Sequence, residues 1–280
     1  LLKEEKLFRS FLFYFTSEGK RISGQVNLPR NAELIGSDPL RGTDPLRRKH
    51  PVIVMLRGYI DKEKYKTGDG TRKVAAIFAQ NGFITLAPDF LGYGYSDAGD
   101  EDSMIARFET YVTAINILNS VGTLPQANTD WVFLWGHSNG GQVALSVLEI
   151  TGRNIPTSLW APVSKPFPFS ILFYSDDAID SGKLLRRMVS NFDKDYDAEK
   201  YSLTSYLGWI RAPLQIHQGF LDEAVPSHWS KELVKSLTDL KKEVKYYEYQ
   251  GDDHNFANGS WNGVVLKDLR FFEKFLLTND

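Results

Sequence analysis

The sequence predicts an α/β fold with a mostly parallel sheet, because short apolar runs alternate with helical stretches from residue 51 onward. Each run is apolar at successive positions, which is typical of central parallel strands that helices cover on both faces. A chain of 280 residues has room for two domains, but α/β folds of this size often form one. We predict a single domain over residues 1–280 that contains a small cap-like insertion at residues 163–207.

The N-terminal part of the chain is predicted to form antiparallel strands. Residues 8–16 and 21–28 are rich in β-formers, and the polar connection between them is typical of a hairpin. The polar stretch 29–49 contains a short repeat of Asp-Pro-Leu-Arg, and Asp-Pro favours turns. We therefore expect this stretch to be a surface loop.

The alternating part follows, and its apolar runs and amphipathic stretches predict the remaining elements. The predicted strands are 52–56, 83–87, 131–135, 159–161, 214–217 and 244–249. The predicted helices are 71–80, 104–120, 141–149, 227–240 and 263–277. The alternation stops over 163–207, where prolines crowd the start and a charged helical stretch at 182–197 follows. This interruption predicts a cap over one end of the sheet.

The composition excludes several classes of function. Lysine and arginine number 33 against 35 aspartates and glutamates, so the formal net charge is −2 and no nucleic-acid partner is expected. No apolar run approaches the roughly 18–20 residues that span a bilayer, so we expect a soluble chain. The absence of cysteine excludes disulfides, thiolate metal sites and a cysteine nucleophile. The chain begins at Leu1, so we expect that an N-terminal segment has been removed. The compartment, cytoplasmic or secreted, and the oligomeric state stay open.

The pentapeptide Gly-His-Ser-Asn-Gly at residues 136–140 fits the Gly-x-Ser-x-Gly pattern. A predicted strand enters it and a predicted helix leaves it. A serine on such a turn has a strained backbone, and its hydroxyl is presented at the carboxyl edge of the sheet. This context predicts Ser138 as a nucleophile, and the alternative is an ordinary loop between strand and helix.

A serine hydroxyl needs a base, and among the five histidines His254 lies in a loop between the last strand and the last helix, from which it can reach Ser138. His137 lies inside the turn and is expected to point away from the serine. The base needs a carboxylate that fixes its tautomer. Asp222 follows a predicted strand and is the candidate, with Glu223 second.

Backbone N–H groups near the nucleophile are expected to bind a developing oxyanion. Asn139 follows the nucleophile and supplies the first. The second is expected from the loop after the first parallel strand, where the N–H or the phenol of Tyr59 is the candidate. The alternative for Tyr59 is an aromatic residue that lines the pocket. No metal and no organic cofactor are expected.

Candidate substrate contacts are Arg57 in the same loop and three aromatic residues of the insertion, Phe167, Phe173 and Tyr174. Aromatic side chains in a loop-rich insertion near the carboxyl edge suit an apolar acyl or aryl pocket. The alternative is that they pack the insertion onto the domain.

With these motifs in order, the chain resembles the α/β-hydrolase fold family. Within that family it is most similar to the catalytic domain of prolyl-oligopeptidase-type (S9-like) hydrolases and to related serine esterases. The matching segments are 56–59, 88–96, 136–141, 217–222, 225–226 and 253–256. The resemblance implies a triad of Ser138, Asp222 and His254, with Tyr59 and Asn139 around the oxyanion.

Two features depart from the relatives. Arg57 stands where many lipases and esterases have a histidine before the glycine. The oligopeptidases also carry a large β-propeller in front of this domain, which the short N-terminal part cannot form.

The leading prediction is a serine hydrolase that cleaves small carboxylic esters through an acyl-enzyme. The first alternative is a small S9-like serine peptidase or acyl-peptide hydrolase, because the same triad cleaves amides; the missing propeller counts against it. The second alternative is a non-catalytic binding protein with the hydrolase fold, against which the complete triad argues. The expected partner is therefore a small ester or a short acyl or peptide substrate.

Overall fold

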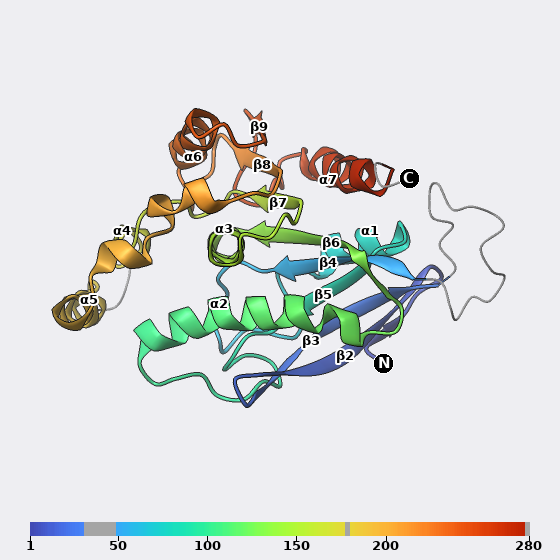
Figure 1. The fold of residues 1–280 in the computed structure, drawn as a ribbon, viewed down its shortest axis with the longest axis horizontal. Coiled ribbons are helices and arrows are strands. Elements are labelled where there is room, and N and C mark those ends of the chain that lie inside the picture. The colour runs from blue at the N-terminus through green and yellow to red at the C-terminus, as the bar shows by residue number, and fades with distance from the viewer. Residues whose placement is uncertain (31–48, 177–179, 278–280) are drawn as a thin grey trace.

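The computed structural model describes residues 1–30, 49–176 and 180–277 (Figure 1). The predicted surface loop falls mainly on residues 31–48, outside the described part. The described strands form one sheet of nine, in the order β1-β2-β3-β5-β4-β6-β7-β8-β9. Their bounds are β1 Lys3–Glu4, β2 Phe8–Ser17, β3 Lys20–Pro29, β4 His50–Leu56, β5 Ile84–Pro88, β6 Ala127–His137, β7 Thr157–Trp160, β8 Leu214–Gly219 and β9 Val244–Tyr249.

Strands β1 to β3 are antiparallel, and β3 also pairs antiparallel with β5. From β5 onward, neighbouring strands are parallel. The β2–β3 hairpin closes through Glu18 and Gly19, whose φ angles are 49° and 77°. Two successive positive φ values match the twist of a two-residue hairpin turn. The predicted fold class, a mostly parallel sheet with antiparallel N-terminal strands, is therefore confirmed.

Helices cover both faces of the sheet. Their bounds are α1 Arg72–Gln80, α2 Ser103–Ser120, α3 Asn139–Thr151, α4 Phe169–Leu172, α5 Lys183–Asp195, α6 Ser227–Asp239 and α7 Trp261–Leu276, with short 3₁₀ helices at Val121–Thr123, Ala198–Tyr201, Leu203–Ser205 and Leu207–Trp209. Helices α1 and α7 pack on one face, where the Phe78 and Phe272 rings lie 5.9 Å apart. Helices α2, α3 and α6 pack on the other face.

The two apolar clusters explain the continuous apolar runs of the central strands. Strand β4 is buried along its whole length, because its side chains alternate between the two clusters. Val54 enters the cluster under α2 and α3, whereas Ile53 enters the cluster under α1 and α7. This core fixes the positions at which the strands end.

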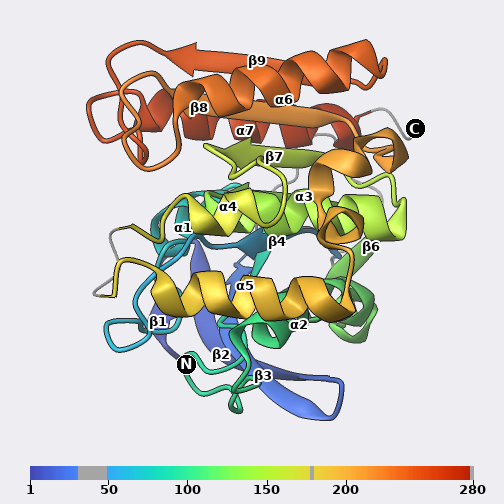
Figure 2. The ribbon, with the colours of Figure 1, turned by 90° about the vertical axis from the view of Figure 1, so that its left-hand side faces the viewer.

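The segment 163–207 lies at the end of the sheet toward which the central arrowheads point (Figure 1). Figure 2 shows α5 crossing in front of α2, and Figure 1 places it at the N-terminal end of that helix. Helix α5 buries Val189 against Met104 of α2 and Phe167. The helix predicted over residues 182–197 corresponds to α5, whereas α4 was not predicted because prolines surround it.

Candidate active site

Ser138 lies on a sharp turn between β6 and α3. Its backbone angles are φ 56° and ψ −121°, which a residue with a side chain rarely adopts. The turn is pressed against β4: a Cβ on Gly140 would lie 2.0 Å from the Leu56 carbonyl oxygen. Glycine is therefore required at this position, and the strand–turn–helix context expected around Ser138 is present.

Asp222 and His254 come together at the carboxyl ends of β8 and β9. The Nδ1–H of His254 donates to Asp222 Oδ2 over 2.8 Å. The same carboxylate accepts from Gln218 Nε2 at 2.9 Å and from the N–H groups of Ala224 and Val225 at 2.9 and 2.7 Å. Asp222 is buried, so these bonds fix the orientation of its carboxylate and, through it, of the imidazole. The Nε2 atom of His254 is left as the proton acceptor.

His137, which was expected to point away from the serine, has its ring against that of His254. The two ring centroids are 4.6 Å apart, and the His137 Nε2–H donates to the His254 carbonyl oxygen over 3.0 Å. Burial, followed by the charge of His254, lowers the pKa of His137 to about 3. Sequence reasoning missed this contact because 117 residues separate the two histidines.

The loop after β4 lies directly beside the serine. A Cβ on Gly58 would lie 3.0 Å from Ser138 Cβ, so the backbone at Gly58 passes the serine side chain at close range. Asn139 is the first residue of α3, and N–H groups of a first helical turn have no acceptor within the helix. Tyr59 is 73% exposed, and partial burial together with its hydrogen bond to Asp61 raises the pKa of its phenol.

Arg57 supports this loop from the interior of the protein. Its side chain is 6% exposed, and its guanidinium lies over Tyr65 and Tyr93 at 4.4 and 4.1 Å from the ring centroids. It donates to the carbonyl oxygens of Gly58 and Asp89. Because two aromatic rings and two carbonyl oxygens already engage the guanidinium, its position favours bracing the loop over contacting substrate.

The three aromatic residues expected to bind substrate differ in exposure. Phe167 is 5% exposed and packs against Phe108 and Phe192, with centroids 6.1 and 5.4 Å away. This matches the alternative that such residues pack the insertion. Phe173 and Tyr174 are 41% and 38% exposed.

Phe173 and Tyr174 pack against α6, and Tyr174 is also close to Asp222. Both contact Trp229 of α6, with centroids 4.8 and 6.4 Å away, and Phe169 contacts the same indole. Burial and the charge of Asp222 raise the pKa of Tyr174 to about 12. The sequence did not indicate Trp229 as a candidate substrate contact, because its spacing in a predicted helix is typical of a core residue.

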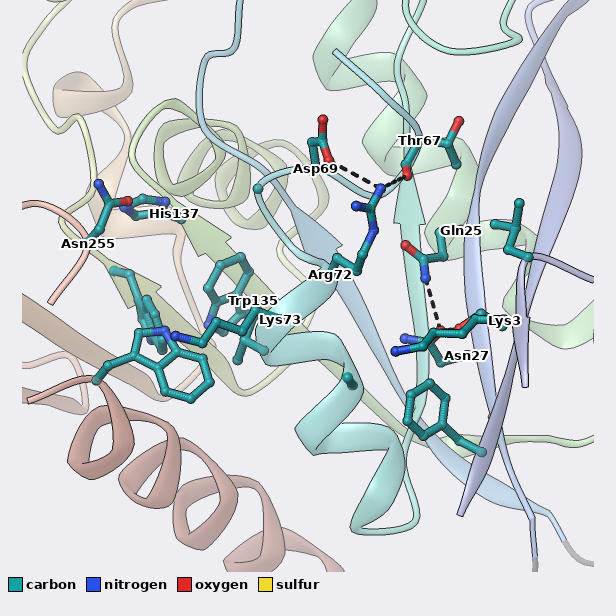
Figure 3. A pocket seen from close by; sticks show the side chains of 18 of the residues that line it. Lys3, Gln25, Asn27, Thr67, Asp69, Arg72, Lys73, Trp135, His137 and Asn255 are labelled. Atoms are coloured by element: carbon teal, nitrogen blue, oxygen red, sulfur yellow. Dashed lines mark hydrogen bonds and ion pairs between the residues drawn. The ribbon is translucent and has the colours of Figure 1, made fainter. Parts of the chain in front are cut away.

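A cavity of about 1020 Å³ lies on the α1 and α7 face, behind the His254 loop (Figure 3). His137, Trp135 and Asn255 line one end, and polar residues of β2 and β3 line the other. Ser138, Asp222 and His254 are not among the described residues that line it. The cavity thus adjoins the back of the site and not the nucleophile.

Two kinds of structural feature are absent from the described ranges. No group of three or more histidine, cysteine, aspartate or glutamate side chains there is arranged to hold a metal ion. None of the helices in this part of the chain combines the length and apolarity needed to cross a membrane.

Comparison with solved structures supports the fold. A puromycin-hydrolyzing peptidase of Mycobacterium tuberculosis superposes with a TM-score of 0.72 at 17% identity, over 98% of this chain and 40% of that chain. The acylaminoacyl peptidase of Pyrococcus horikoshii gives 0.69 at 18%, over 96% and 42%. The α/β hydrolase GrgF of Penicillium sp. gives 0.66 at 16%, over 95% and 98%.

The chain thus spans about two fifths of the two peptidases and nearly the whole of GrgF. No curated protein matches the sequence. The family model of the prolyl oligopeptidase family, peptidase S9, matches residues 70–278. That match covers the serine turn, the aspartate and the histidine loop, so the chain belongs to the prolyl oligopeptidase family.

Proposed function

We propose that the protein is a serine peptidase or acyl-peptide hydrolase that works through an acyl-enzyme. The observation that carries the proposal is the 2.8 Å bond between His254 and Asp222, formed at the strand ends near which the strained turn presents Ser138. The family match to residues 70–278 favours amide substrates over the simple esters expected from the sequence.

In the proposed reaction, Nε2 of His254 accepts the proton of Ser138 while Oγ attacks the substrate carbonyl carbon. Asp222 holds the imidazole in the Nδ1–H tautomer and stabilises the imidazolium that forms. The oxyanion is bound by the N–H of Asn139 and by the Tyr59 side of the loop after β4. The imidazolium then protonates the leaving amine, and water releases the acyl group by the same steps in reverse.

Phe169, Phe173 and Tyr174 form a half-exposed aromatic surface on Trp229, close to Asp222. Such a surface suits an apolar side chain or acyl group next to the scissile bond. We propose that it sets the preference for the residue on the acyl side. Esters with apolar acyl groups are the second candidate substrates, because the same surface accepts them.

The test is a panel of substrates with matched apolar acyl groups: aryl esters, aminoacyl anilides and N-acetyl-aminoacyl anilides. We expect anilide cleavage, and we expect Ser138→Ala and His254→Ala to lower it by about 10⁴-fold or more, because triad members act as a unit. A fluorophosphonate should label Ser138 and leave Ser138→Ala unlabelled. Turnover of aryl esters alone would establish the second candidate, and residual wild-type activity in Ser138→Ala would refute both.

A further inference from the structure

The imidazole of His137 lies against that of His254, and the reaction above assigns His137 no role. The ring planes are inclined by 33°, and the hydrogen bond from His137 Nε2 to the His254 carbonyl joins β6 directly to the loop after β9. The pair therefore combines a tilted ring-to-ring contact with a hydrogen bond to the backbone. The contact fixes both the imidazole and the peptide that carries it.

The lowered pKa of His137 leaves its ring uncharged near neutral pH. Burial and the neighbouring His254 lower the pKa of His137, and these outweigh its bond to the His254 carbonyl and the charge of Asp222, both of which raise it. A neutral ring presents an electron-rich face to its neighbour. The His254 ring, which becomes an imidazolium during the proposed reaction, has its centroid 4.6 Å from that of His137.

The ring of His137 is braced from behind. Trp135 and Trp160 lie 6.2 and 6.3 Å from it, centroid to centroid. Trp160 is itself fixed, because its Nε1–H donates to the buried Asp268 over 2.8 Å. Phe256 of the His254 loop packs edge-on against Trp160 at 5.3 Å. In Figure 3 His137 and Asn255 lie next to each other at one end of the cavity.

We propose that His137 is a positioning residue for His254: its N–H holds the catalytic loop and its ring face stabilises the His254 imidazolium. The inference rests on the proposed function, because it assigns His137 a role in the same proton transfer. The two effects are separable, since a phenyl ring supplies a face without a donor and a carboxamide supplies a donor without a face.

The charged groups around His254 are Asp222 and, on its own loop, Asp252 and Asp253. Asp252 accepts from the N–H groups of Asn258 and Ser260, and Asp253 accepts from those of Asn255 and Ala257. None of these carboxylates bonds to His137 within the described part of the chain. Substituting His137 therefore leaves the partners of these carboxylates in place.

The test compares His137→Phe, His137→Gln and His137→Leu by the pH profile of kcat/KM on an anilide substrate, with active sites counted by fluorophosphonate labelling. We expect the acidic limb to keep its position in His137→Phe and to move about one unit to lower pH in His137→Gln and His137→Leu. In His137→Phe we expect kcat to fall about ten-fold with KM unchanged, because the carbonyl of His254 loses its donor.

The matched control is His50→Phe. His50 is also buried, and its Nδ1 lies 3.0 Å from the Gly82 carbonyl oxygen, but it stands at the opposite end of β4 from the serine loop. We expect it to lose thermal stability while kcat and the pH profile stay unchanged.

If the three His137 variants lose activity only in proportion to stability, with an unmoved acidic limb, the positioning role is refuted. That outcome differs from failure of the proposed function, in which Ser138→Ala itself stays active.

Discussion

At the scale of single residues, Asp222 is the side chain whose chemistry depends most on geometry. Asp222→Asn keeps the shape but favours the wrong tautomer of His254, so we expect kcat to fall by about 10⁴-fold. Asp253→Asn is the matched control, because Asp253 accepts only backbone N–H groups of its own loop. Steady-state kinetics of both variants make the comparison. Equal losses in the two would mean that the acid has been misassigned.

Glu149 of α3 gives a second residue-scale prediction. It is buried, its Oε1 has no hydrogen-bond partner among the described residues, and burial raises the pKa of its carboxyl to about 9. The unfolded chain loses this proton near pH 4.5, so the folded state binds the extra proton between about pH 4.5 and 9. Stability therefore falls as the pH rises through that window.

Glu149→Gln removes this titration. We expect the variant and the wild type to unfold with similar free energy at pH 4, and the variant to gain an advantage on the order of a few kcal/mol by pH 9. Urea unfolding at pH 4, 7 and 9 measures the difference. An advantage that does not grow with pH would show that Glu149 is solvated in the folded protein.

Local patterns in the sequence predict Ser138, Asp222 and His254 as site residues, because each follows an apolar run with its own turn residues. It could not locate His137 as a neighbour of His254, because the contact depends on the order of β6 to β9 in the sheet. The sequence also could not predict the burial of Arg57, because the tyrosines around it come from separate loops.

At the scale of elements, strands with two buried faces were predicted to within a few residues, since their apolar runs have clear ends. Strand β6 begins at Ala127, four residues before the predicted start, because its polar first half extends past the core. The short helix α4 and strand β1 carry too few residues for any periodicity. Such elements depend on tertiary contacts and not on pattern.

Within the insertion, we expect one aromatic side chain to contribute to stability and another to substrate preference. Phe167→Ala removes a buried ring, so we expect a loss of about 3–5 kcal/mol in unfolding free energy with little change in substrate preference. Phe173→Ala removes a half-exposed ring on Trp229, so we expect little loss of stability and a shift of roughly 1–3 kcal/mol between apolar and small acyl-side residues. Paired kcat/KM ratios and thermal melts distinguish them. The reverse pattern would place the substrate pocket elsewhere.

At the scale of the whole molecule, parallel pairing brings distant residues to one edge. Strands β6, β7, β8 and β9 are paired in parallel, so the loops carrying Ser138, Asp222 and His254 all leave from the same edge. The site is thus assembled by the topology of the sheet. Its rigidity depends on how firmly α7 and the strands hold one another.

Asp268 of α7 makes that connection in the interior. Its carboxylate accepts from Ser158 Oγ at 2.5 Å, Trp160 Nε1 at 2.8 Å and Gln215 Nε2 at 3.0 Å, and His217 Nε2 lies 3.1 Å away. Asp268 and His217 are fully buried, and three elements far apart in sequence meet here. No local pattern in the sequence indicates this cluster.

Asp268→Ala would leave several buried donors without an acceptor, so we expect the free energy of unfolding to fall by about 3–5 kcal/mol. Asp239→Ala on the exposed face of α6 is the control, because its ion pair with Lys235 is exposed and contributes about 0.5 kcal/mol or less. Urea unfolding measures both. Because Trp160 braces the ring of His137, we also expect Asp268→Ala to lose activity at temperatures below its unfolding temperature. If Asp268→Ala is as stable as the control variant, the cluster does not tie α7 to the sheet.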